Sequence, residues 1–228
     1  MNDLLNLLTD AVFPPFCLNC ASPNSFLCEN CQEQLVPVKQ PTCFFCHKLT
    51  SHFESCSSCR SASFLTGVIP AFYYNELAKR LIARFKYHDF AAVGSLMADF
   101  MLQALERVPR ITSRIHQIVP VPLHFRRRSF RGYNQAEILA RRISRVLHKP
   151  FSLSLKRVKA TQAQAQLTRR ERQQNLSGAF RWQGEPLMGN NIFLIDDVAT
   201  SGETLNEAAR ELRGAGAREV WGIVFAKG

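Results

Sequence analysis

Eight cysteines near the start of the chain have a spacing that suits metal binding. All lie between residues 17 and 59, as four C-x-x-C pairs: Cys17/Cys20, Cys28/Cys31, Cys43/Cys46 and Cys56/Cys59. Two thiolates of one tight turn can reach a single tetrahedral ion, and two turns complete a four-sulfur site. Zinc fits this ligand set best, because it is tetrahedral, redox-silent and drawn to thiolate. The spacing predicts two structural zinc ions, ahead of an iron–sulfur cluster, disulfides or free thiols.

The pairing of these turns has two solutions. Consecutive pairs would give two zinc ribbons in series, whereas alternate pairs would give a cross-braced unit. The short intervening loops favour the consecutive scheme. A module this small cannot build an adequate core, so metal binding must supply much of its folding free energy.

A second group of polar residues follows the apolar run 191–195. Asp196 and Asp197 come directly after this expected strand, and a helix is expected from Gly202. The N-terminus of a helix presents unpaired backbone N–H groups and a partial positive charge, which favour a phosphate. The two carboxylates could accept hydrogen bonds from vicinal ribose hydroxyls. We therefore predict a phosphate and ribose site at Asp196, Asp197, Ala199, Thr200, Ser201, Gly202 and Thr204.

Residues 124–172 form a strongly basic segment. It holds fourteen Lys and Arg residues against two Glu, a balance of +12, compared with +11 for the whole chain. Arginine dominates, which favours bidentate contacts with phosphate. Phe125, Phe130 and Tyr133 lie among the arginines and could stack on bases. A solvated basic face is the competing interpretation, above all for Arg141, Arg142 and Arg145.

The elements that must position these residues alternate in type. Strands are expected at 68–74, 115–119, 153–158, 191–195 and 219–225. Helices are expected at 76–87, 91–107 and 202–213, and from an Asn134 cap to Leu147. The last of these should bury Ile138, Leu139, Ile143, Val146 and Leu147. Residues 159–176 are polar and Gln-rich, typical of a long loop or a loosely held helix. The pattern predicts an α/β fold with a parallel sheet flanked by helices over 67–228, preceded by a cysteine-rich module over 1–62.

Composition limits the possible settings of the chain. The 228 residues are 46% hydrophobic, as expected of a globular protein, and the pI near 9.6 favours polyanionic partners. No stretch approaches the ~18 apolar residues of a membrane span, and the start lacks a secretory signal. We expect a cytoplasmic protein in which disulfides are rare.

The Asp196–Thr204 segment resembles the ribose-phosphate loop of type I phosphoribosyltransferases. The resemblance narrows to the ComF (GntX-like) family through Val119-Pro-Val-Pro122, the arginines that follow, Arg131-Gly-Tyr-Asn-Gln-Ala-Glu137, and the motif from Thr161 to Phe180. An N-terminal double zinc ribbon is also common in that family. The resemblance to type I phosphoribosyltransferases implies that the acidic pair contacts the ribose of phosphoribosyl pyrophosphate (PRPP), with Mg²⁺. It also implies that the loop holds the 5′-phosphate of PRPP.

The same resemblance assigns two further groups of residues. The loop corresponding to the pyrophosphate loop would bind pyrophosphate or DNA phosphates, through Arg126, Arg127, Arg128, Arg131, Gly132, Asn134 and Gln135. A mobile loop would close over the site and contains Thr161, Gln164, Arg172 and Asn175.

The function implied by the resemblance is the handling of internalised single-stranded DNA during natural transformation. The zinc ribbons and the basic loops would form the DNA-binding surface, and the PRPP-type pocket would be retained as an accessory or regulatory site. A transformation helicase or a recombination mediator would be a partner. The alternative is an active Mg²⁺-dependent phosphoribosyltransferase with an unknown acceptor, which would rely on electrostatic stabilisation of pyrophosphate. A purely structural adaptor has least support, because it leaves the phosphate loop unexplained.

Overall fold

A four-stranded parallel sheet forms the centre of the computed structural model, which describes residues 16–87, 90–123, 132–159 and 176–228. Its strand order is β1-β6-β5-β2, with the strands β1 (Gly67–Tyr73), β6 (Glu219–Lys227), β5 (Asn191–Ala199) and β2 (Gln117–Pro120). The central strand β5 pairs with β2 on one side and β6 on the other. Its run Ile192–Ile195 is fully buried, as expected for a parallel strand covered on both faces.

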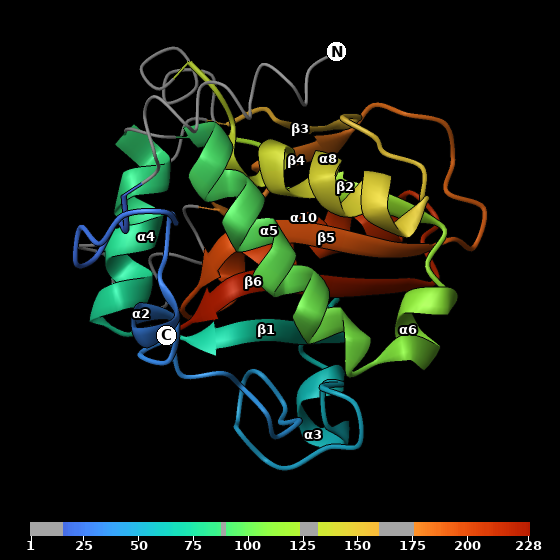
Figure 1. The fold of residues 1–228 in the computed structure, drawn as a ribbon. Coiled ribbons are helices and arrows are strands. Elements are labelled where there is room, and N and C mark those ends of the chain that lie inside the picture. Colours follow the sequence, from blue (N-terminus) through green and yellow to red (C-terminus); the bar gives the residue numbers. More distant parts are fainter. Residues whose placement is uncertain (1–15, 88–89, 124–131, 160–175) are drawn as a thin grey trace.

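Helices cover both faces of the sheet (Figure 1). The helices α4 (Glu76–Tyr87), α5 (Phe90–Glu106) and α8 (Gln135–Leu147) lie on one face. The other face carries α10 (Glu203–Gly214) and a two-stranded antiparallel sheet of β3 (Leu155–Arg157) and β4 (Phe180–Trp182). A short helix, α6 (Pro109–Ser113), leads into β2. Each face has its own apolar core, so the site at the strand ends rests on a rigid base.

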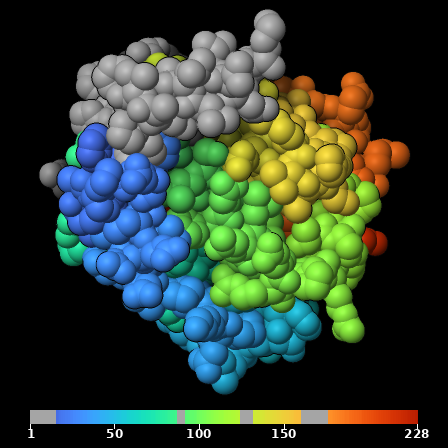
Figure 2. Space-filling model, in the orientation of Figure 1, coloured from blue at the N-terminus to red at the C-terminus, as the bar shows by residue number. Residues whose placement is uncertain are grey.

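The cysteine-rich segment lies along the edge strand β1. It contains two one-turn helices, α2 (Glu29–Gln32) and α3 (Ser57–Arg60). Backbone hydrogen bonds join this segment to β1, from Val38 N to Ala71 O (3.0 Å), and to Thr66 just before β1, from Ser55 N to Thr66 O (2.8 Å). Figure 2 shows this segment, in blue, covering one side of the molecule. It thereby covers a strand edge that would otherwise expose unpaired backbone groups.

Most of the expected elements are confirmed, with three corrections. Strand β5 does not end before the acidic pair but continues to Ala199, because Ala199 still pairs with Lys227 of β6. Val146 is not buried on α8, since its side chain is 48% exposed. Asn134 precedes α8 as expected, but its side chain makes no capping bond there and instead donates from Nδ2 to Val121 O (3.0 Å).

Some elements were not expected from sequence. Strand β4 and helix α6 are too short to show a clear periodicity, and neither was predicted. None of the helices in the described residues is both long and apolar enough to cross a membrane.

Candidate metal centres and phosphate-binding site

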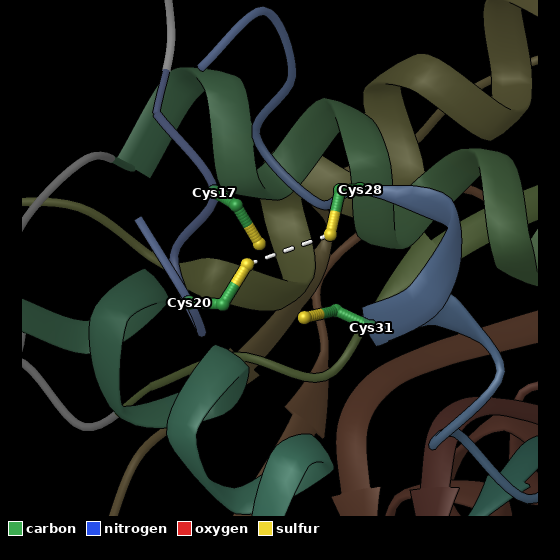
Figure 3. Close-up of side chains that lie close together, drawn as sticks. All are labelled: Cys17, Cys20, Cys28 and Cys31. Atoms are coloured by element: carbon green, nitrogen blue, oxygen red, sulfur yellow. Dashed lines mark hydrogen bonds between the residues drawn. The ribbon is translucent and has the colours of Figure 1, made fainter. Parts of the chain in front are cut away.

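The first four cysteines converge on one point (Figure 3). The Sγ atoms of Cys17, Cys20, Cys28 and Cys31 all lie within 4.8 Å of one another, and Cys20 and Cys28 are 3.5 Å apart. A tetrahedral ion with Zn–S bonds of about 2.3 Å needs sulfurs about 3.8 Å apart. The ligand set therefore fits zinc, and the consecutive pairing is confirmed.

The second group, Cys43, Cys46, Cys56 and Cys59, has the same geometry. Burial favours a raised pKa for Cys43, but hydrogen bonds from nearby backbone amides outweigh it and lower the pKa to about 7. Burial and the three neighbouring thiols raise the pKa of Cys59 to about 12. Four thiolates cannot coexist here without a compensating cation, and a divalent metal ion supplies that charge.

Both groups are built from the same two local structures. The first pair of each group closes a turn, with hydrogen bonds from Ala21 N to Cys17 O (2.8 Å) and from His47 N to Cys43 O (2.9 Å). The second pair of each group spans a one-turn helix, whose N-cap is Cys28 in α2 and Cys56 in α3. Turn and helix point their thiols inward, so each ribbon is complete without a histidine ligand.

The acidic pair lies at the carboxyl end of β5. Asp197 is 7% exposed, and its Oδ2 lies 2.8 Å from Nζ of Lys86 on α4. Asp196 accepts a hydrogen bond at Oδ1 from the Asp197 backbone N–H (2.9 Å). Burial, followed by the negative charge of Asp197, raises the pKa of Asp196 well above its usual range. A bound cation or hydroxyl donor at this pair would relieve that unfavourable charge, so the two carboxylates could hold Mg²⁺ or ribose hydroxyls.

A cavity of about 220 Å³ opens beside the acidic pair. Gln135 is 3% exposed, and its Nε2 has no hydrogen-bond partner among the described residues. A buried donor without a partner is costly, so a ligand oxygen in the cavity would satisfy it. The polar and charged residues of the lining are Lys86, Asn134, Gln135, Arg157, Asp196, Asp197 and Thr204.

The loop between β5 and α10 is supported from behind by the second ribbon. Gly202, the N-cap of α10, has a φ of +78°, in the left-handed region that favours glycine. A Cβ at this position would lie 2.8 Å from Cε1 of Phe44 and 3.2 Å from Cε1 of Phe45. Phe44 is 6% exposed and packs edge-on against Phe45. The aromatic pair between Cys43 and Cys46 therefore fixes the position of the loop.

The structure brings part of the predicted site together. Asp196, Asp197, Thr204, Asn134 and Gln135 line the same cavity. Ser201 lies at the edge of a separate cavity of about 510 Å³, and Thr200 is exposed. Three more predicted residues, Ala199, Gly202 and the exposed Gly132, are among the described residues. The others lie outside them: Arg126, Arg127, Arg128, Arg131, Thr161, Gln164, Arg172 and Asn175.

Four residues near the site were not predicted. Lys86 and Arg157 line the cavity, and Phe44 and Phe45 pack on the loop. Lys86 ends an amphipathic helix and Arg157 was counted only as part of the basic segment, so neither had a local signal of its own. The two phenylalanines lie inside a C-x-x-C turn. Two adjacent apolar residues are unusual in an exposed turn, so they could have indicated a packing contact.

Comparison with known protein families and curated proteins agrees with this arrangement. Residues 8–60 match the double zinc ribbon domain family, and residues 133–228 match the phosphoribosyl transferase domain family. The chain is 35% identical over 214 residues to "Competence protein F" of Haemophilus influenzae, covering 88% of this chain and 90% of that protein. It is 28% identical over 197 residues to "Competence protein ComFC" of Bacillus subtilis, covering 82% and 78%.

Two further similarities are partial. "DNA utilization protein YhgH" of Escherichia coli K12 is 36% identical over 146 residues, covering 62% of this chain and 64% of that protein. A solved structure titled "Structure of the allosteric regulatory enzyme of purine biosynthesis" aligns with 16% identity and a TM-score of 0.38. It covers 62% of this chain and 29% of that one, and is too remote to support any argument.

Fold and site together define a phosphoribosyltransferase-type α/β protein that carries a double zinc ribbon. The chain belongs to the competence protein F (ComF) family, as its identity to the Haemophilus protein along nearly the whole of both chains shows.

The two cysteine groups predict two zinc ions per chain. Cys31→Ser and Cys59→Ser should each lower the zinc content to one, as measured by atomic emission. Cys31→Ser should also cost more stability, about 3 kcal/mol or more, because Cys31 is buried in the core that includes α4 and α5. Cys59→Ser is the comparison variant for stability, because Cys59 is partly exposed. Two zinc ions retained in both variants would contradict the assignment.

The acidic pair predicts stability changes of opposite sign. Because the pKa of Asp196 is raised in the folded state, its ionisation lowers the free energy of unfolding as the pH rises above the unfolded value of about 3.9. Asp196→Asn should therefore stabilise the protein by about 1 kcal/mol at pH 8, and this gain should disappear near pH 4. Asp197→Asn should destabilise it by about 1–3 kcal/mol by removing the partner of Lys86. Thermal unfolding at both pH values measures the changes, and equal shifts for the two variants would be inconsistent with this electrostatic assignment.

The turn at Gly202 predicts a specific loss of phosphate binding. Gly202→Ala introduces a Cβ with a positive φ against Phe44, so the loop must shift. We expect about tenfold weaker binding of PRPP in calorimetric titration, with two zinc ions retained. Gly214→Ala is the matched control, because no atom beyond its chain neighbours and its own helix backbone lies within 4 Å of its added Cβ, and it should bind like the wild type. Unchanged binding in Gly202→Ala would show that the loop does not hold the phosphate.

Proposed function

We propose that this protein handles single-stranded DNA taken up by the cell and acts in the cytoplasm. The observation that carries the proposal is the similarity, along both modules, to a protein named for competence. A relative of part of the chain is named for DNA utilization. The net charge of +11 supports a polyanionic partner. We propose a transformation helicase or a recombination mediator as its protein partner.

Two arginines of helix α8 are engaged in contacts within the protein. Arg142 makes two hydrogen bonds to Asp99, at 2.7 and 2.9 Å, and Arg141 pairs with Glu137 while lying over the ring of Phe151. Both are therefore engaged in holding α8 in place. This favours a structural role for these two arginines over DNA contact, and the DNA contacts are assigned instead to the segment 126–131 and to other basic surfaces.

The cavity at the acidic pair is proposed to bind PRPP or a related phosphorylated ribose. Asp196 and Asp197 would contact the ribose and share a Mg²⁺ ion, which would supply positive charge against the pyrophosphate. Gln135 would donate to a ligand oxygen, and the loop from Ala199 to Thr204 would hold the 5′-phosphate. In the first candidate function this site is accessory or regulatory to DNA handling.

A second candidate function, phosphoribosyl transfer to an unknown acceptor, is favoured by the same cavity. Gln135 Nε2, which has no hydrogen-bond partner in the described part of the chain, and the raised pKa of Asp196 are features that frequently mark functional sites. Catalysis would rest on electrostatic stabilisation of pyrophosphate as it leaves. Pyrophosphate release measured over a panel of nucleobases and amines tests this function, and silence across the panel with PRPP bound favours the first candidate.

The two-surface proposal predicts separable ligands. A labelled single-stranded oligonucleotide should bind, with an affinity that falls steeply with salt in fluorescence anisotropy. Asp197→Ala should weaken PRPP binding by about tenfold or more and leave DNA binding nearly unchanged, because it removes charge-assisted contacts to one ligand alone. Arg126/Arg127/Arg128→Ala should do the reverse.

Two outcomes would contradict this proposal. Absence of oligonucleotide binding at low salt would remove DNA handling as the function. Equal loss of both ligands in both variants would show that the two surfaces are not separate.

A further inference from the structure

A large groove lies between the second ribbon and the amino edge of the sheet. It has a volume of about 750 Å³, larger than the cavity at the acidic pair. Its walls come from the ribbon (His52, Arg60), the connection to β1 (Phe64), α6 and its C-cap (Arg110, Arg114) and the end of α10 (Arg213). In Figure 2 the ribbon segment and the chain around α6 meet at the lower side of the molecule.

This groove is remote from the candidate phosphate site. Thr66, just before β1, and Glu219, the first residue of β6, line it, so it lies at the amino ends of the parallel strands. Asp196 and Asp197 lie at the carboxyl end of β5, on the opposite edge. The groove is therefore a separate surface.

The carboxylates of the groove are already engaged. Glu54 accepts hydrogen bonds from the backbone N–H groups of Ser51 (3.2 Å) and His52 (2.6 Å). Glu219 accepts from Arg114 (3.2 Å) and from the indole N–H of Trp221 (3.0 Å). Both are satisfied within the protein, and among the described residues Arg114 is the one groove arginine that pairs with either of them.

The groove arginines differ in how many hydrogen bonds they make to the described residues. Arg213 is structural, because its guanidinium donates to Phe64 O (3.1 Å), to Thr66 Oγ1 (3.2 Å) and to Arg218 O. Within the described ranges, Arg60 makes one hydrogen bond, to Ser55 O at 3.3 Å. Arg110 is exposed, and its side chain has no partner among the described residues. Arg60 and Arg110 thus present guanidinium groups, from the ribbon and from α6, to a ligand in the groove.

An aromatic ring completes the surface. The ring of Phe64 is 43% exposed, while its backbone is held by Asn206 Oδ1 (2.8 Å) and by Arg213. A partly exposed ring on an anchored backbone beside arginines offers a flat face on which a planar group can stack. Bases of a single strand stack on such rings while their phosphates pair with arginine.

We propose that this groove binds a short stretch of single-stranded nucleic acid, with its phosphates on Arg60 and Arg110 and a base on Phe64. The inference rests on the proposed function and assigns it a second contact surface, apart from the 126–131 segment. A single strand is favoured over an acidic peptide because the groove combines arginine forks with an exposed aromatic face. The zinc ribbon then contributes directly to DNA binding through Arg60.

The test measures oligonucleotide affinity and its salt dependence on the full chain. Arg60→Ala/Arg110→Ala should weaken binding about tenfold and reduce the slope of log K against log salt by about 1.4, or ~0.7 for each lost phosphate contact. Phe64→Ala should weaken oligonucleotide binding while leaving the slope unchanged. Phe64→Trp, which keeps an aromatic ring, should bind as tightly as the wild type. Arg84→Ala/Arg181→Ala is the charge-matched control, because both residues are exposed and neither lines the groove. Two bound zinc ions and an unchanged melting temperature confirm that each variant is folded.

The possible outcomes separate the two levels of the proposal. If the wild type binds no oligonucleotide, the proposed function fails with the groove. If the wild type binds but the groove variants match the control pair, only the groove assignment is overturned. If poly-glutamate displaces the oligonucleotide from wild type as effectively as unlabelled single strand, the groove is an acidic-protein surface, and the nucleic-acid assignment is overturned.

Discussion

The contact between the second ribbon and the loop at Gly202 is the constraint on which the site depends. The loop requires a left-handed residue, and Phe44 and Phe45 occupy the space where any side chain at that position would go. These rings are held by the turn between Cys43 and Cys46, and that turn needs a metal ion to bring four thiols together. Metal binding in the ribbon and the shape of the loop between β5 and α10 are therefore mechanically linked.

This arrangement explains why the zinc ribbons are integrated with the sheet. Cys17 and Cys31 belong to the apolar core of the α4–α5 face, while Phe44 belongs to the core around α10. The connecting backbone also pairs with β1 and with the residue before it. The cysteine-rich segment is thus stabilised by packing on the α/β domain in addition to its metal ions. The α/β domain is stabilised by the same contacts.

The two edges of the sheet differ in chemistry. At the carboxyl edge, carboxylates, an amide and a lysine face a small cavity suited to a phosphorylated ribose. At the amino edge, arginines and an exposed ring face a larger groove suited to a polymer. The parallel arrangement produces this separation, because all strand starts lie at one edge and all strand ends at the other. On the proposed assignments, a nucleotide-like ligand and a nucleic acid would bind without competing for the same residues.

The sequence by itself determined the elements and the local sites. The four C-x-x-C turns, the apolar runs of β5 and β6, and the acidic pair before a helix start are local patterns, and each was found where predicted, although β5 continued past the acidic pair to Ala199. Only the tertiary structure decided which distant residues meet: Lys86 with Asp197, Phe44 with Gly202, and Arg60 with Arg110 across one groove. Periodicity and capping act over a few residues, whereas these contacts depend on how helices and ribbons pack around the sheet, which no local pattern encodes.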